Sequence, residues 1–308
     1  MTMSNRYTYQ GPLNGGYAIQ DQGITWELRD FCESTYEWRE FFAADGVTDH
    51  SEKFIERFSR WIRKSKLNNI KGMDAFPHVT QTNGTSEAFQ MFIQRHSNTR
   101  TFKFFKGDFM MHKVASNNAK VGWSWIYNYS EIQEGDALII SCPFSDTGSE
   151  HNDMKQILDW CTANGVPVLI DMAYFGMCYN INVNLDKPCV EEVTFSLGKT
   201  FPIIGARAGI RIQRKEIDDP VLFANQHGIV NNFGAMIGDI CLEGWGPDYI
   251  PNKYMKAQMI VCNQLEIKPT KCVIFGLSNH EEHYKFNRGN DLTRLCLSKL
   301  LVEEYERT

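Results

Sequence analysis

Residues 196–209 read SLGKTFPIIGARAG and contain the two cationic side chains Lys199 and Arg207. A run of β-forming residues at 193–196 predicts a strand that ends just before the lysine, and 208–212 predicts another that begins just after the arginine. The apolar Pro-Ile-Ile segment between them would lower the pKa of Lys199 and help it act as a nucleophile and base. Arg207, between two glycines, suits bidentate contact with an anion. The stretch therefore indicates a covalent anchor beside an anion clamp; the alternative is a surface lysine in a polar loop.

Strands and helices alternate on either side of this stretch, which predicts an α/β fold with a mostly parallel central sheet and helices on both faces. After Pro220 the pattern changes, and we expect a reduced C-terminal subdomain. We therefore expect the whole chain to divide into three regions: an N-terminal arm with the start of the small subdomain (1–50), a large ligand-binding domain (51–220), and helices with the reduced C-terminal subdomain (221–308). The expected strands are 101–105, 123–127, 137–142, 166–170, 193–196, 208–212 and 272–276; the expected helices are 51–66, 85–96, 153–163, 221–242 and 252–265, with a final strand and helix at 292–305.

Composition narrows the class of protein. The chain has 308 residues, of which 43% are hydrophobic, and a net charge of -5 without a long basic run, so we expect no nucleic-acid partner. The nine cysteines show no zinc-type spacing, which predicts reduced thiols, no metal site and a cytoplasmic protein. The polar N-terminus predicts no signal peptide, and no apolar run approaches the ~18 residues of a membrane span.

Three other segments carry candidate site residues. Gly84, Thr85 and Ser86 open the helix predicted at 85–96, where unpaired N–H groups could bind a phosphate, although an ordinary helix cap has the same pattern. Asp171 follows the strand at 166–170. If its carboxylate is buried, it needs a partner for its charge; the alternative is that it caps the next helix. Arg294 stands in an otherwise apolar strand, where it could bind a carboxylate or form a structural ion pair.

Taken in order, these segments resemble the fold-type I pyridoxal phosphate (PLP) enzymes, and most closely the class I/II aminotransferases. Residues 196–209 are similar to their lysine motif, and Asp171–Tyr174 to their Asp-x-Ala-Tyr motif. Residues 83–88 resemble the cofactor-phosphate turn, and 293–298 the strand that carries the carboxylate-binding arginine. Residues 143–148, PFSDTG, stand in the place of the Asn-Pro-x-Asn-Pro-Thr-Gly segment.

The resemblance implies a role for each matching residue. Lys199 would form the Schiff base with pyridoxal 5'-phosphate and move the proton, Asp171 would keep the pyridine nitrogen protonated, and Tyr174 would hydrogen-bond the ring oxygen. Arg294 would bind the substrate carboxylate. Phe109 would stack on the ring, with His112 as the alternative. The expected cofactor-binding residues are Gly84, Thr85, Ser86, Phe109, Ser145, Asp171, Tyr174, Ser196, Lys199 and Arg207.

The chain also departs from the family pattern. Ser145 replaces the asparagine that normally contacts the ring oxygen, and the chain is shorter than typical members, a loss that we expect in the N-terminal arm and the small domain. Residues 11–16 resemble a residual substrate-covering arm.

The resemblance predicts an aminotransferase that acts on amino-acid and keto-acid substrates, in a homodimer. The same apparatus also serves a decarboxylase, a racemase, or a lyase or replacement enzyme acting at Cβ or Cγ. A degenerate binding protein of this fold is a further alternative. A nucleotide-binding protein lacks support because no GxGxxG or P-loop motif occurs.

Overall fold

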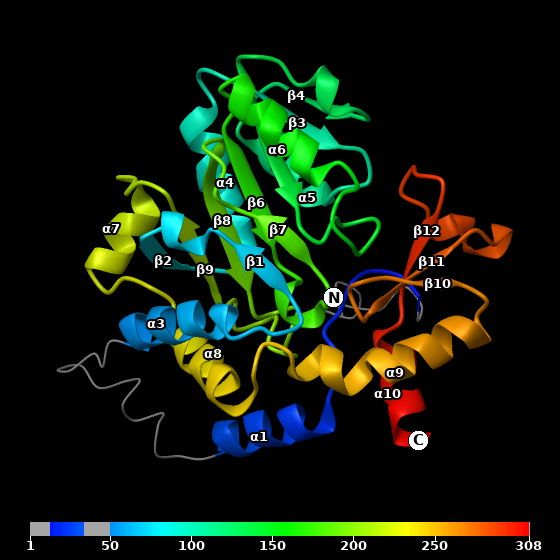
Figure 1. Ribbon diagram of the computed structural model, residues 1–308. Coiled ribbons are helices and arrows are strands. Elements are labelled where there is room, and N and C mark those ends of the chain that lie inside the picture. Colours follow the sequence, from blue (N-terminus) through cyan, green and yellow to red (C-terminus); the bar gives the residue numbers. More distant parts are fainter. Residues whose placement is uncertain (1–12, 34–49, 308) are drawn as a thin grey trace, which may run out of the picture.

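A computed structural model describes residues 13–33 and 50–307 of the chain, and its centre is a seven-stranded sheet of order β2-β9-β8-β6-β5-β3-β4 (Figure 1). Strands β8, β6, β5, β3 and β4 run parallel, and β9 is antiparallel to both of its neighbours. The fold class predicted from the sequence is thereby confirmed. The strands of this sheet are β2 (His78–Thr82), β3 (Thr101–Phe105), β4 (Trp123–Ile126), β5 (Asp136–Ser141), β6 (Val168–Met172), β8 (Val190–Ser196) and β9 (Gly209–Gln213).

Two hydrophobic cores lie on opposite faces of the sheet. Successive side chains of a strand point to opposite faces, so in β5 Leu138 and Ile140 join one core while Ala137 and Ile139 join the other. The second core contains side chains of α4 (Thr85–His96) and α5 (Met110–Asn118). The first contains side chains of α3 (His50–Arg63), α6 (Met154–Ala163) and α8 (Asn232–Gly244). Burial on both faces explains why the parallel strands read as continuous apolar runs.

A smaller unit follows the central sheet along the chain. Strands β10 (Lys268–Pro269), β11 (Phe275–Ser278) and β12 (Thr293–Cys296) form an antiparallel sheet. Helices α9 (Tyr249–Gln264) and α10 (Ser298–Arg307) pack against each other beside it (Figure 1). Residues 13–17 run along this unit: the Leu13 carbonyl accepts a hydrogen bond from the Cys296 N–H, and the Tyr17 carbonyl accepts one from Ser298 Oγ. The other α-helices and strands are α1 (Gln22–Glu33), α7 (Pro220–Gln226) and the parallel pair β1 (Asn69–Lys71) and β7 (Asn182–Asn184); short 3-10 helices lie at Met73–Ala75, Tyr129–Glu131, Phe175–Met177 and Glu281–Phe286.

The expected long helix at 221–242 is wrong in one respect, because it is two helices. Helix α7 ends at Gln226 and α8 begins at Asn232. Gly228 between them has φ +66°, a left-handed conformation that stops a helix, and the Asn231 side chain caps α8 by accepting a hydrogen bond from the Gly234 N–H. The strand expected at 272–276 also lies later, at 275–278. Of the described helices, none combines the length and apolarity needed to cross a membrane.

Candidate functional site

A cavity of about 190 Å³ opens where β5, β6 and β8 end and α4 begins. In parallel sheets the carboxyl ends of the strands meet at one edge, which is where ligands bind. Apart from Gly84 and Arg294, every residue predicted for the site lines this cavity. Four residues to which the sequence assigned no role, Ser141, Ala173, Gly198 and Ile204, complete the wall. The lining residues are Thr85, Ser86, Phe109, Ser141, Ser145, Asp171, Ala173, Tyr174, Ser196, Gly198, Lys199, Ile204 and Arg207.

Lys199 lies in the loop after β8, with its ammonium nitrogen inside the fold. Nζ donates a hydrogen bond to the Gly16 carbonyl at 2.8 Å and lies 5.7 Å from the centre of the Tyr174 ring. Burial lowers the pKa of Lys199, and the nearby positive charges of Arg294 and Arg207 lower it further. A larger fraction of this amine is therefore neutral, and nucleophilic, than in a solvent-exposed lysine at the same pH.

This lowered pKa predicts a pH-dependent cost to stability. At a pH between the lowered pKa of Lys199 in the folded protein and its value of about 10.4 in the unfolded chain, the unfolded chain binds more protons. The free energy of unfolding therefore rises with pH across this range, and the destabilisation caused by burying Lys199 is greater at the low-pH end. We expect Lys199→Met to stabilise the protein more at pH 7.5 than at pH 10, as measured by urea unfolding. A difference between variant and wild type that is the same at both pH values would contradict the lowered pKa.

Asp171 lies near the end of β6 and is 3% exposed. Oδ1 accepts a hydrogen bond from the Ala173 N–H at 3.0 Å, and Oδ2 accepts one from Thr85 Oγ1 at 3.3 Å. His112 Nε2 lies 3.5 Å from the same Oδ2. The Asp171 carboxylate thus accepts hydrogen bonds from two uncharged donors and lies next to the His112 imidazole. Because Asp171 also lines the cavity, it can accept a further hydrogen bond from a ligand there.

Phe109 and His112, the two candidates for the stacking ring, have different positions. Phe109 lines the cavity at the start of α5, whereas His112 is fully buried and does not line it. The two rings meet edge to face with centroids 5.6 Å apart. Phe109 is therefore placed to contact a ligand, whereas His112 lies beside Asp171 without a hydrogen bond from either ring nitrogen in the described part of the chain.

Ser86, Ser196 and Arg207 gather at the first turn of α4. Arg207 Nη2 donates to the Asn83 carbonyl at 2.8 Å and to Ser86 Oγ at 3.4 Å. Arg207 has φ +57°, an uncommon conformation for a residue with a Cβ. Gly84, the N-cap of α4, has φ +74°, and a Cβ there would lie 3.1 Å from Arg207 Nη2. Hydroxyls, a guanidinium and the helix N-terminus together form a cradle for an anion.

Arg294, on β12, lies one layer behind the cavity wall. Its Nη1 donates to the carbonyl of Ser145 and its Nη2 to that of Gly15 at 2.7 Å, and its guanidinium lies 4.0 Å from the centre of the Phe275 ring. The motifs did not reveal Arg288, whose Nη1 donates to Ser145 Oγ at 3.0 Å. Arg288 lies in an irregular segment, so only its charge could have identified it.

Residues 15 and 16 contact two of the cationic side chains predicted for the site. The Gly15 carbonyl contacts Arg294 and the Gly16 carbonyl contacts Lys199. Gly16 packs so closely on Tyr174 that a Cβ would overlap the phenol oxygen. Burial raises the pKa of Tyr174 to about 12, so its hydroxyl stays protonated and can donate. Of the segment 11–16 that resembles a substrate-covering arm, residues 11 and 12 lie outside the described residues.

Residues 112–238 match the family model described as "Aminotransferase class I and II". No curated protein matches the chain. The family match covers the Asp171, Lys199 and Arg207 motifs, and it confirms the resemblance that these motifs predict.

Solved structures of the same fold are similar over nearly their whole length. The PLP-bound C-S lyase from Staphylococcus hominis has a TM-score of 0.68 at 11% identity, covering 100% of this chain and 95% of its own. The probable N-succinyldiaminopimelate aminotransferase from Thermus thermophilus has a TM-score of 0.67 at 13% identity, with coverages of 96% and 93%. The histidinol-phosphate aminotransferase from Clostridium acetobutylicum has a TM-score of 0.64 at 14% identity, with coverages of 95% and 96%. At these identities the similarity shows a shared fold.

Proposed function

We propose that the chain binds pyridoxal 5'-phosphate in the Lys199 cavity and acts as an aminotransferase on amino-acid and keto-acid substrates. The observation that carries this proposal is that one cavity contains a partly buried amine, a buried carboxylate and an anion cradle. These three features match the aldehyde, the pyridine nitrogen and the phosphate of that cofactor. The family match over residues 112–238 supports the same assignment.

The residues present fit the cofactor at both ends. Ser86, Ser196, Arg207 and the first turn of α4 would hold the phosphate. Lys199 Nζ would hold the aldehyde covalently, which requires it to leave the Gly16 carbonyl. Asp171 would accept a hydrogen bond from the protonated ring nitrogen, and Tyr174 or Ser145 would donate to the ring oxygen. Phe109 would cover one face of the ring.

When bound, the cofactor's cationic ring accepts the electron pair released at the substrate's Cα. The chain supplies the proton chemistry: Lys199 Nζ, with its lowered pKa, takes the proton from Cα and later gives it up. Arg294 would orient the substrate by binding its carboxylate. To do so, its guanidinium would give up its hydrogen bonds to the carbonyls of Ser145 and Gly15 and donate to the carboxylate oxygens instead. Gly16 over Tyr174 would help to exclude water.

The test of this proposal is spectroscopic. The purified chain mixed with pyridoxal 5'-phosphate should develop a visible absorption band that borohydride removes, and peptide mass mapping should then find the reduced adduct on Lys199. A mixture that shows no band, or an adduct spread over surface lysines, would reject the cofactor assignment.

A lyase acting at Cβ is the second candidate, because the solved structures of this fold include a C-S lyase. The two activities differ in their products. We expect amino acids to yield keto acids only in step with consumption of a second keto acid. Release of thiol and ammonia from a sulfur-containing amino acid without a keto-acid acceptor would favour the lyase.

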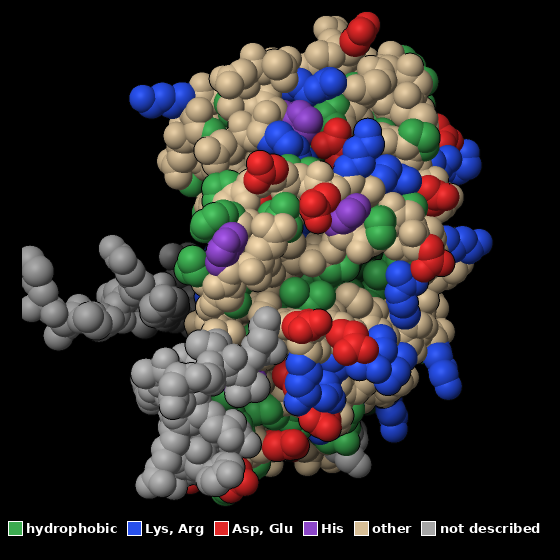
Figure 2. All heavy atoms as spheres, turned by 90° about the vertical axis from the view of Figure 1, so that its left-hand side faces the viewer, with side chains coloured by type: hydrophobic (Ala, Val, Ile, Leu, Met, Phe, Trp, Pro, Cys, Tyr) green, Lys and Arg blue, Asp and Glu red, His purple; other side chains and the backbone are tan. Residues whose placement is uncertain are grey.

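A homodimer is part of the proposal and has its own test. Ile204, which lines the cavity, is 49% exposed, and Phe223 and Ile229 near α7 are 54% and 67% exposed. Figure 2, which views the molecule from the α7 side, shows apolar side chains among charged ones on this face. We expect light scattering after size exclusion to give twice the mass of one chain, and Phe223→Asp with Ile229→Asp to shift the protein toward monomer. A wild-type monomer at working concentration would contradict the dimer.

A further inference from the structure

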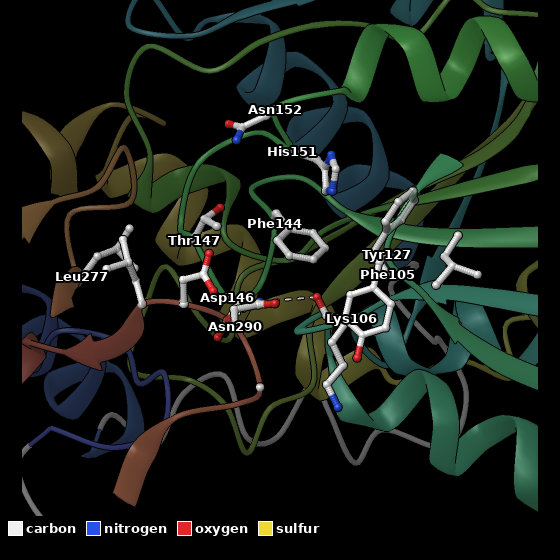
Figure 3. A pocket seen from close by; sticks show the side chains of 14 residues that line it. Phe105, Lys106, Tyr127, Phe144, Asp146, Thr147, His151, Asn152, Leu277 and Asn290 are labelled. Carbon is white, nitrogen blue, oxygen red and sulfur yellow. Dashed lines mark hydrogen bonds between the residues drawn. The ribbon is translucent and has the colours of Figure 1, made fainter. Parts of the chain in front are cut away.

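A second cavity, of about 450 Å³, lies beside the Lys199 cavity along the same edge of the sheet (Figure 3). Strands β3 and β4 and the loop after β5 provide one side, and residues 289–292, just before β12, provide the other. Ser145 lines the Lys199 cavity while Asp146 lines the second one, so the two cavities share this part of the chain as a wall. None of the residues assigned to the proposed cofactor lines the second cavity, so its binding properties can be tested without that cofactor.

Asp146 is a buried acceptor in this second cavity. Its side chain is 2% exposed, and Asn290 Nδ2 donates to its Oδ2. Within residues 13–33 and 50–307, Oδ1 has no hydrogen-bond donor. Arg288 Nε lies 4.0 Å from Oδ1, beyond hydrogen-bond distance, and the guanidinium instead donates to Ser145 and to the Asp108 carbonyl. Burial raises the pKa of Asp146, whereas Asn290 and the positive charges of Arg288 and Arg294 act to lower it; none of these groups donates a hydrogen bond to Oδ1, so a cation that reaches Oδ1 would supply a bond that they do not.

The walls around this carboxylate suit a cation that is partly apolar. Phe105, Phe144 and Tyr127 bring aromatic rings to the cavity, and aromatic faces attract cations. Figure 3 shows Asp146 on one side of Phe144, with Phe105 and Tyr127 on the other. His151 packs between Phe105 and Phe144, with ring centroids 4.5 and 5.1 Å away.

Of the charged and titratable groups that line the cavity, none forms an ion pair with Asp146 within the described residues; Arg288, at 4.0 Å from Oδ1, is not part of the lining. His151 Nδ1 accepts a hydrogen bond from the Asp153 N–H, and burial lowers the pKa of this histidine, so the ring is neutral near pH 7. Lys106 Nζ lies 5.9 Å from the centre of the Trp125 ring, and no ion pair joins it to Asp146 in the described part of the chain. Asp291 adds a second, exposed carboxylate at the rim.

We propose that this cavity binds the ammonium or guanidinium group of a small organic cation, with Asp146 Oδ1 as its acceptor and the aromatic rings around its apolar stem. The cation could be the side-chain end of a basic amino acid whose α-carboxylate reaches Arg294, or a separate amine. Both sources share the same chemistry at Asp146.

The test is calorimetric titration of the full chain with 1,5-diaminopentane, using 1,5-pentanediol as a neutral probe of the same length. We expect saturable binding of the diamine, no saturable binding of the diol, and a loss of about tenfold or more in Asp146→Asn, the effect of removing one charge-assisted hydrogen bond. The rim variant Asp291→Asn is the matched control and should keep most of the affinity. Urea unfolding of each variant establishes that it is folded.

Several results would overturn the proposal: no saturable heat with the diamine, equal affinity for the diol, or an Asp146→Asn variant that is folded and binds as tightly as wild type. A further comparison identifies the source of the cation. If Arg294→Ala weakens the binding of L-lysine but not of 1,5-diaminopentane, the cavity takes a substrate side chain. If it weakens neither, the cavity takes a separate amine.

Discussion

Replacing Lys199 with alanine should lower kcat/KM for amino-group transfer by about 10⁴-fold or more, because it removes both the covalent anchor and the base. Each role requires a neutral amine at this position, which burial and the nearby arginines favour by lowering the pKa of Lys199. The same substitution should eliminate the borohydride-sensitive band. Steady-state kinetics and absorption spectra of the two proteins measure both effects.

Lys256→Ala is a matched control for this experiment, because Lys256 lies on the exposed side of α9, outside the Lys199 cavity. We expect that variant to keep wild-type kinetics. Far-UV circular dichroism should show that Lys199→Ala is folded, since within residues 13–33 and 50–307 the Lys199 side chain donates one hydrogen bond, to the Gly16 carbonyl. If folded Lys199→Ala retained more than a few per cent of the wild-type rate, Lys199 would not be the base.

The apolar sequences of the buried strands explain why the fold class was predictable. The buried parallel strands β5 and β6 read as apolar runs that no surface element would have. Strand β2 was not predicted because its sequence, HVTQT, is mostly polar. Its side chains instead meet partners far along the chain: Thr80 Oγ1 accepts a hydrogen bond from Arg211 at 3.2 Å, and Gln81 Nε2 donates one to the Asn231 carbonyl at 2.7 Å. Such partners cannot be recognised from local spacing.

The site was predictable where it depends on motifs, and it was missed where it depends on packing between distant segments. Lys199, Asp171 and Arg207 stand in recognisable local patterns, and the structure brings them to one cavity. Arg288 reaches the site from an irregular segment whose sequence has no periodicity. Gly16 belongs to the segment 11–16 that resembles a substrate-covering arm, but its contact with Lys199 could not be predicted from the sequence. The position of Asp146 in a cavity likewise could not be predicted from local sequence, because residues 289–292 form the opposite wall of that cavity. The roles assigned to all of these residues remain predictions.

The second large effect is expected at Asp171. Asp171→Asn keeps the shape of the side chain and an oxygen that can accept from the Ala173 N–H, but it removes the charge that would stabilise a protonated ring nitrogen. Losing one partner of a buried charged pair costs about 3–5 kcal/mol, and if that cost falls on the transition state we expect kcat to fall by roughly 10²- to 10⁴-fold. The absorption band should remain, because Lys199 is intact, although its position should change with the protonation of the ring.

A purely structural Asp171 would behave differently. The carboxylate also contacts Thr85 and His112, so an alternative is that it only ties α4 and α5 to the sheet. In that case Asp171→Asn would lower the free energy of unfolding while the folded fraction kept its kcat. Thr85→Val, assayed at saturating cofactor because Thr85 is also a predicted cofactor-binding residue, is the matched comparison: it removes one of these contacts without removing the charge. A kcat that falls in Asp171→Asn but not in Thr85→Val would assign the effect to the charge, whereas equal losses of stability with unchanged kcat in both would leave Asp171 a structural residue.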